Sequence, residues 1–268
     1  MTGVAPDWLA LREDADAAAR ATGLLGPLRA CLPGGPLVIR DLGCGTGANL
    51  RWLAPRLPGP QHWILHDHDA ELLALAAAGT VRSADGTPVT TQADHSDLTR
   101  LRAADLAGTS LVTASALLDL LNGHEVESLA DACRTAGCPA LLTLSVAGRV
   151  ELTPADPLDA EIVAAFNDHQ RREVAGRGRL LGPDAPAVTA AAFRRHGWQL
   201  LTRPSRWRLG HGQPALIARW LREWCAAALE QRPGLAADVE DYLARRLRAC
   251  ADGRLRVTVH HVDLLAYG

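Results

Sequence analysis

The chain reads Leu-Val-Ile-Arg-Asp-Leu-Gly-Cys-Gly-Thr-Gly-Ala-Asn-Leu-Arg-Trp from Leu37 to Trp52, and this stretch decides the fold. Its apolar start follows the breaker Pro33-Gly34-Gly35-Pro36 and predicts a short buried strand. Three glycines at alternate positions come next, and a helical pattern of leucines follows at once. A strand, a glycine turn and a helix let the backbone approach a nucleotide-like ligand closely, because a side chain at those glycines would occupy the ligand's space.

The acidic residue before this turn narrows the class of ligand. Asp41 places a carboxylate where a cationic amine could sit, whereas a phosphate-binding turn would gain nothing from a negative charge. The turn therefore indicates a nucleoside that carries an amino acid. The pattern Gly43-x-Gly45-x-x-Ala48 can also be written as a dinucleotide fingerprint, so the rest of the chain has to decide between the two.

Residues Asp41 to Gly47 resemble the first motif of the class I S-adenosylmethionine-dependent methyltransferases, an acidic residue followed by x-Gly-x-Gly-x-Gly, at every diagnostic position. The resemblance extends well over residues 37–146 and covers the later chain only in its strand order. It implies S-adenosyl-L-methionine as the cofactor and in-line transfer of its sulfonium methyl group to a nucleophile. It also implies cofactor contacts from Asp41, Gly43, Cys44, Gly45 and Gly47.

Further cofactor contacts are expected where the next strand ends. A strand at Trp63–Leu65 leads to Asp67, about 20 residues beyond the glycine turn, where a carboxylate can accept hydrogen bonds from ribose hydroxyls. His68 follows it and is included in the predicted cofactor site. His66 and His68 could suggest a metal site, but no metal site is predicted here.

The third and fourth strands complete the expected cofactor site. A strand at Pro88–Gln92 precedes Asp94 and His95, and the resemblance implies that Asp94 accepts a hydrogen bond from the adenine amino group. The alternative is that Asp94 or Asp97 caps the next turn. A strand at residues 111–114 ends in small residues that allow close approach by a ligand, Ala114 and Ser115.

Strands and helices alternate through five units, which predicts an α/β fold with a doubly wound, mostly parallel sheet. We expect seven strands with an antiparallel last strand, residues 255–262 pairing with residues 198–207. The chain is interpreted as one methyltransferase domain of residues 1–268. Its expected parts are N-terminal cover helices (1–36), a cofactor-binding core (37–146) and a substrate side (147–268) with a helical pair inserted at 214–250.

Composition limits the classes of function. The 268 residues carry a formal net charge of −2 and lack the basic excess that usually marks nucleic-acid binding. All 28 residues counted as lysine plus arginine are arginines, which excludes lysine chemistry. The six cysteines form no Cys-x-x-Cys pair and are interpreted as reduced structural thiols. No apolar signal core or membrane-length run is found, so we expect a soluble, cytoplasmic protein.

A general base would assist transfer to an oxygen or nitrogen acceptor. We predict that His169 is this base or the main orienting group, because it shares the apolar face of a helix at Leu158–Ala175 with Ile162 and Phe166. His124 is the next candidate. Asp119 is expected to orient such a histidine, and residues flanking or covering the site are expected to contact the acceptor: Asn167, Arg171, Trp8 and Arg12. The alternative for Trp8 and Arg12 is a cover helix with a solvated arginine.

The chain lacks the Pro-Pro-Tyr/Trp signature expected after the fourth strand in enzymes that methylate nucleic-acid amino groups. Together with the charge balance, this favours a small-molecule acceptor, such as a specialised metabolite. Two alternatives stay open: an RNA methyltransferase with a basic partner chain, and a cofactor-binding partner or regulatory protein that transfers no methyl group. A tryptophan stripe in the helix at Pro214–Glu230 predicts core packing, or else a lid or homodimer contact.

Overall fold

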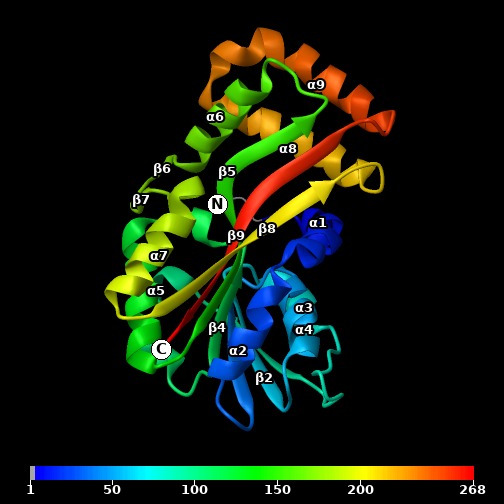
Figure 1. Ribbon diagram of the computed structural model, residues 1–268. Coiled ribbons are helices and arrows are strands. Elements are labelled where there is room, and N and C mark those ends of the chain that lie inside the picture. The colour runs from blue at the N-terminus through cyan, green and yellow to red at the C-terminus, as the bar shows by residue number, and fades with distance from the viewer. Residues whose placement is uncertain (1–3) are drawn as a thin grey trace.

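The computed structural model describes residues 4–268 and contains a seven-stranded sheet in the order β3-β2-β1-β4-β5-β9-β8 (Figure 1). Strands β1 to β5 are parallel, and β9 runs antiparallel to both β5 and β8. This confirms the predicted mostly parallel sheet with an antiparallel last strand. The strands are β1 (Leu37–Leu42), β2 (Gln61–Asp67), β3 (Thr90–His95), β4 (Leu111–Ser115), β5 (Ala140–Thr153), β8 (Gln199–Leu209) and β9 (Arg256–Tyr267).

Helices cover both faces of the sheet. Apolar side chains of α5 and α7 pack with one face of β4, β5 and β9, and those of α2 and α3 pack with the other face of β1 and β2. The helices are α1 (Pro6–Ala19), α2 (Leu25–Cys31), α3 (Ala48–Leu53), α4 (Ala70–Ala77), α5 (Gly123–Ala136), α6 (Asp159–Gln170), α7 (Ala185–Arg195), α8 (Pro214–Gln231) and α9 (Ala236–Ala251). Within residues 4–268, no helix is long and apolar enough to cross a membrane.

Three strands, β5, β8 and β9, are much longer than β1 to β4 and carry a second core. Strand β5 has 14 residues and β9 has 12, and their extended ends are packed by α6, α8 and α9 at one end of the molecule (Figure 1). The predicted helical insertion therefore lies on this extension. Trp220 and Trp224 of α8 stack with ring centroids 4.8 Å apart and are 8% and 1% exposed. The tryptophan stripe is core packing.

The helix predicted at Leu158–Ala175 ends earlier than expected. The structure ends α6 at Gln170 and places a short hairpin after it, β6 (Glu173–Val174) and β7 (Gly178–Arg179). The turn of this hairpin uses Gly176 and Gly178 at φ +76° and +82°, a conformation that a helix cannot contain and that glycine adopts without a steric penalty. The hairpin directs Arg177 back towards the parallel half of the sheet.

Candidate functional site

A cavity of about 750 Å³ lies at the carboxyl ends of β1, β2 and β4, with α1 over it. This is the crevice where open α/β sheets bind their ligands. The sequence predictions placed nine of its lining residues in the site: Trp8, Arg12, Gly43, Cys44, Gly45, Asp67, His68, Ser115 and Asp119. The other lining residues are Val4, Leu9, Asp16, Arg20, Thr46, Ala48, Asn49, Leu72, Asp97, Leu98, Thr99, Ala116, Leu117, Leu120, Leu121 and Arg177.

The glycine turn between β1 and α3 forms one wall of the cavity. Gly43 and Gly45 have φ of +62° and +54°, which L side chains rarely adopt. A Cβ on Gly43 would lie 3.0 Å from Leu117 Cδ1, and one on Gly45 would lie 3.2 Å from Leu9 Cδ1. Both leucines line the cavity. The two glycines therefore keep open a space that can cradle a bound group, which is the fit that the nucleoside cofactor requires.

Gly47 has a different function from the other two glycines. It caps α3 at φ +82° and lies outside the cavity lining, and a Cβ there would approach Ala76 of α4 to 3.2 Å. The third glycine of the motif thus allows α3 and α4 to pack closely. It does not face the space where a ligand would lie.

Asp41 is fully buried beneath the cavity wall and does not line it. Asn49 Nδ2 donates to Asp41 Oδ1 at 2.9 Å and to Thr113 Oγ1 at 3.1 Å. Asp41 Oδ2 has no hydrogen-bond partner within residues 4–268, and burial raises the pKa of this carboxyl to about 7. Its charge acts on the cavity from behind Asn49, which does line the wall.

Asp67 connects the end of β2 to the glycine turn. Its Oδ2 accepts the backbone N–H of Gly45 at 2.9 Å, and its Oδ1 accepts that of Asp69 at 3.1 Å. His68 Nδ1 lies 3.2 Å from Asp67 Oδ1, and the His68 side chain is 55% exposed. Each carboxylate oxygen has a second lone pair, so Asp67 can still accept a hydrogen bond from a ligand in the cavity.

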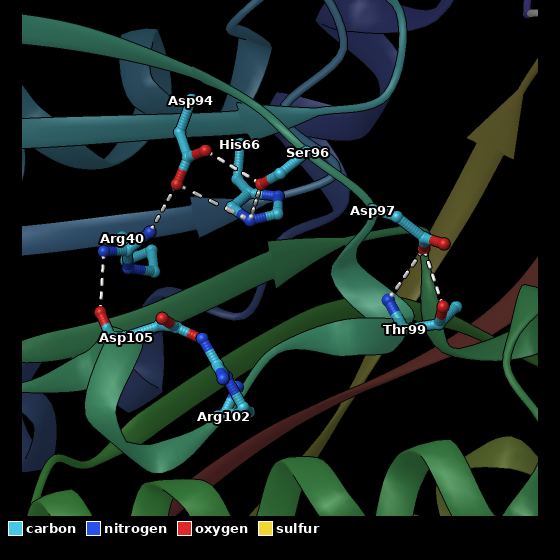
Figure 2. Close-up of polar contacts among 8 residues, drawn as sticks. All are labelled: Arg40, His66, Asp94, Ser96, Asp97, Thr99, Arg102 and Asp105. Carbon is cyan, nitrogen blue, oxygen red and sulfur yellow. Dashed lines mark hydrogen bonds and ion pairs between the residues drawn. The ribbon is translucent and has the colours of Figure 1, made fainter.

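Asp94 does not line the cavity. Figure 2 shows its contacts with Arg40, His66 and Ser96. Arg40 Nη1 donates to Asp94 Oδ2 at 2.8 Å, and Ser96 Oγ donates to Asp94 Oδ1 at 2.8 Å. His66 Nε2 lies 2.9 Å from Ser96 Oγ and 3.7 Å from Asp94 Oδ2. Serine and aspartate thus meet the same ring nitrogen, which is not the arrangement of a nucleophilic triad. These contacts hold the ends of β2 and β3 together.

The position expected for Asp94 is taken by the residues that follow β3. The strand starts at Thr90 and runs to His95, three residues beyond the predicted end, so Asp94 belongs to the sheet and pairs with His66. Asp97 and Thr99 reach the cavity instead. Asp97 Oδ1 accepts one hydrogen bond from the backbone N–H of Thr99 at 3.0 Å and another from the Thr99 hydroxyl at 2.7 Å (Figure 2). His95 is exposed outside the lining, with Nε2 2.9 Å from the carbonyl oxygen of His68.

One face of α1 covers the cavity with Trp8, Arg12 and Asp16, and Arg20, which directly follows the helix, continues the spacing of four. A spacing of four places side chains above one another on a helix. Arg12 Nε donates to Asp16 Oδ2 at 2.8 Å, and Trp207 Nε1 of β8 donates to Asp16 Oδ1 at 2.8 Å. The predicted positions of Trp8 and Arg12 over the site agree with this placement. Asp16 and Arg20 were missed, although the same spacing could have found them.

The loop after β4 forms another wall of the cavity. Ala116 has a φ of +52°, a strained conformation for alanine, and both it and Ser115 line the cavity, whereas Ala114 is buried in β4. Asp119 follows them in the lining. Its Oδ1 is sealed from solvent and has no hydrogen-bond partner in the described chain, and burial raises the pKa of this carboxyl to about 6.

The predicted catalytic histidines lie outside the cavity. His169 Nε2 is 3.1 Å from Glu230 Oε2 of α8, an exposed carboxylate, so the ring joins α6 to α8. The expectation that this ring points into the acceptor side is wrong, because α6 packs on the strand extension and not on the parallel half. His124 is exposed in the first turn of α5, where it too is outside the lining.

Two predicted acceptor contacts also face other surfaces. Asn167 Nδ2 donates to the carbonyl oxygen of Gly148 at 2.8 Å, and Arg171 forms a two-point ion pair with Asp184 at 2.7 and 2.8 Å. Both contacts fix α6 to its neighbours. No described residue of α6, α8 or α9 lines the cavity, whereas residues of α1, the loop after β4 and Arg177 do.

No protein-family model and no curated protein matches the chain. Among solved structures, a "Putative Type II Methyltransferase from Anaeromyxobacter dehalogenans" is 16% identical, with 93% of this chain and 97% of that chain covered and a TM-score of 0.52. The cyclopropane synthase MmaA2 from Mycobacterium tuberculosis is 15% identical over 91% of this chain and 83% of that chain, with a TM-score of 0.45. The first likeness, with the strand order, shows that the chain has the Rossmann-like methyltransferase fold.

Proposed function

We propose that this chain, which has the class I methyltransferase fold, transfers a methyl group from S-adenosyl-L-methionine to an oxygen or nitrogen atom of a small molecule. The observation that carries the proposal is the continuity of one cavity. It extends from the glycine turn at Gly43–Gly45 to the unpartnered carboxyl of Asp119. A donor and an acceptor can therefore occupy the same cavity, as in-line transfer requires.

The cofactor half of the cavity is formed by the ends of β1, β2 and β3. Gly43 and Gly45 leave the space that the cofactor would fill, and Asp67 offers free lone pairs for its ribose hydroxyls. Asp97, which lines the cavity whereas Asp94 does not, would accept a hydrogen bond from the adenine amino group. When bound, the cofactor supplies an electrophilic sulfonium methyl group. The contribution of the chain is to hold it, orient it and keep water away under α1.

Asp119 is our candidate for the group that accepts the proton of the methyl acceptor. Its pKa of about 6 leaves it ionised at neutral pH but close enough to the working pH to act as a general base. It replaces His169 and His124 in this function because it is the one of the three that lines the cavity. The Asp119 side chain lines the cavity, and its Oδ1 has no hydrogen-bond partner in the described chain, so this carboxylate would be the group that meets a hydroxyl or amine of the acceptor.

A small-molecule acceptor is supported by the size and lining of the cavity. Its volume of about 750 Å³ falls within the range of roughly 300–1,000 Å³ that is usual for ligand pockets. Leu117, Leu120 and Leu121 surround Asp119 with apolar surface. The chain has a net charge of −2, which does not favour a nucleic-acid substrate.

The proposal is tested by two measurements on the full chain. Calorimetry should show micromolar binding of S-adenosylmethionine and S-adenosylhomocysteine, and none of nicotinamide dinucleotides. A tritiated methyl donor is then incubated with a metabolite extract or with total RNA. Label in the small-molecule fraction supports the proposal, and its loss in Asp119→Asn assigns the base. Label in RNA would establish the RNA-methylating alternative. Cofactor binding with no transfer to either fraction would favour a regulatory protein.

A further inference from the structure

Arg20 is a buried arginine that the methyl-transfer steps above do not use. It follows the last residue of α1 and lines the cavity, yet only 4% of its surface is exposed. Its Nη2 donates to Ser115 Oγ at 3.0 Å, and Ser115 lines the same cavity. Nε and Nη1 are buried and have no hydrogen-bond partner within residues 4–268. An unpartnered buried polar group destabilises a folded protein, and an unpartnered buried charge does so more strongly.

The other arginines of the cavity wall differ from Arg20 in this respect. Arg12 is paired with Asp16 at 2.8 Å, and Arg177 is paired with Glu125 at 2.6 Å. Each of these guanidinium groups has its anion within the protein. Arg20 stacks over the ring of Trp52 at 5.3 Å and forms no ion pair within residues 4–268, so no carboxylate of the described chain neutralises it at contact distance.

Three carboxylates surround Arg20 without satisfying it: Asp16, Asp41 and Asp263. Each has its own donors. Asp16 accepts from Arg12 and Trp207, Asp41 accepts from Asn49, and Asp263 accepts the backbone N–H groups of Ala21 and Leu144. They favour the charged form of the guanidinium at a distance, although burial lowers the pKa of Arg20. The protein therefore keeps a positively charged guanidinium at the cavity wall, with N–H donors that have no acceptor among the described residues.

The position of Arg20 indicates which part of the cofactor it would contact. It meets Ser115 at the end of β4, beside β1 and its glycine turn, whereas Asp67 and Asp97 lie towards β2 and β3. A ligand with its ribose near Asp67 and its adenine near Asp97 would have its amino-acid end towards β1 and β4. A carboxylate is the group on that end that a guanidinium binds best, because the two planar groups match in geometry.

We propose that Arg20 is a specificity-determining residue that binds the α-carboxylate of the methionine part of S-adenosylmethionine, with Ser115 holding its Nη2. This inference rests on the proposed function, since it assumes that S-adenosylmethionine fills the cavity. It adds that the protein distinguishes the complete amino-acid cofactor from nucleosides that lack the carboxylate. Asp41, which lies behind the same wall, would favour the neighbouring ammonium group.

The test compares S-adenosylmethionine with decarboxylated S-adenosylmethionine, which keeps the sulfonium and the amine but lacks the carboxylate. Calorimetry on the wild-type chain should show about 10- to 100-fold weaker binding of the decarboxylated ligand, the range expected for a charge-assisted hydrogen-bonded pair. In Arg20→Gln, binding of S-adenosylmethionine should weaken by the same factor, while binding of the decarboxylated ligand stays unchanged. The ratio of the dissociation constants of the two ligands then approaches one.

Arg56→Gln is the matched control. Arg56 also stacks on the ring of Trp52, at 4.8 Å, but does not line the cavity. This variant should therefore keep the wild-type ratio of the two dissociation constants. Unchanged affinity for S-adenosylmethionine in Arg20→Gln would overturn the inference and point to a carboxylate of the acceptor. An equal loss of affinity for both ligands in Arg20→Gln would also overturn the inference, since that indicates a damaged fold. If the wild-type chain bound neither ligand, the proposed function itself would fail.

Discussion

Replacing Asp119 by asparagine should make the ligand-free protein more stable at pH 8. The side chain lines the cavity, its Oδ1 is sealed from solvent, and no donor within residues 4–268 reaches that oxygen. Burial raises its pKa from 3.8 to about 6, so the folded protein holds an ionised carboxylate at a free-energy cost. Asparagine has nearly the same shape and no charge, and it removes this cost.

The size of the stability gain and the pH range in which it appears follow from the pKa shift of Asp119. A difference of about two pKa units corresponds to at most about 3 kcal/mol, at about 1.4 kcal/mol per unit. The folded pKa is the higher one, so the penalty is absent below pH 3.8, where both states are protonated, and complete above about pH 6. Asp119→Asn should therefore exceed the wild type in stability at pH 8 and match it near pH 3.5.

Urea unfolding at these two pH values measures the effect. With a slope of about 2–3 kcal/mol/M, a gain of about 3 kcal/mol raises the midpoint by about 1 M at pH 8. Asp14→Asn is the control, because Asp14 is exposed on the same covering helix α1 and should show no gain. Equal or lower stability of Asp119→Asn at pH 8 would refute the reasoning, since it would mean that the carboxylate is hydrated or hydrogen-bonded in the folded protein.

Four further variants test other parts of the structure. Gly45→Ala should lower stability by about 1–2 kcal/mol through its positive φ, and its Cβ should weaken S-adenosylhomocysteine binding in calorimetry. Asp67→Ala should weaken that binding by about 1–3 kcal/mol, and unchanged affinity would remove Asp67 from the cofactor site. Trp220→Ala should reduce the free energy of unfolding by about 3–5 kcal/mol without changing the sedimentation mass. His169→Ala should leave cofactor affinity and methyl transfer unaltered, whereas a large loss of turnover would restore it as a catalytic candidate.

The sequence by itself determined the parts of this protein that depend on local backbone geometry and on the order of the elements. The glycines at residues 43, 45 and 47 form the expected turn, all with positive φ, and the alternation of strands with helices predicted the mostly parallel sheet with an antiparallel last strand. Asp67 was also found, because the residue that ends a parallel strand lies at the ligand-binding edge whatever surrounds it. These inferences need only short-range information.

Tertiary structure alone decided which polar side chains meet in the cavity. A bridge between Arg82 and Pro88 precedes β3, and the paired strand runs to His95, so Asp94 faces Arg40 and leaves the cavity to Asp97. The long extension of β5 and β9 carries α6 and His169 away from the crevice. Periodicity shows that a helix has an inward face, but not which core that face enters. That choice depends on contacts between residues far apart in the chain, and so do the unpartnered groups of Arg20 and Asp119.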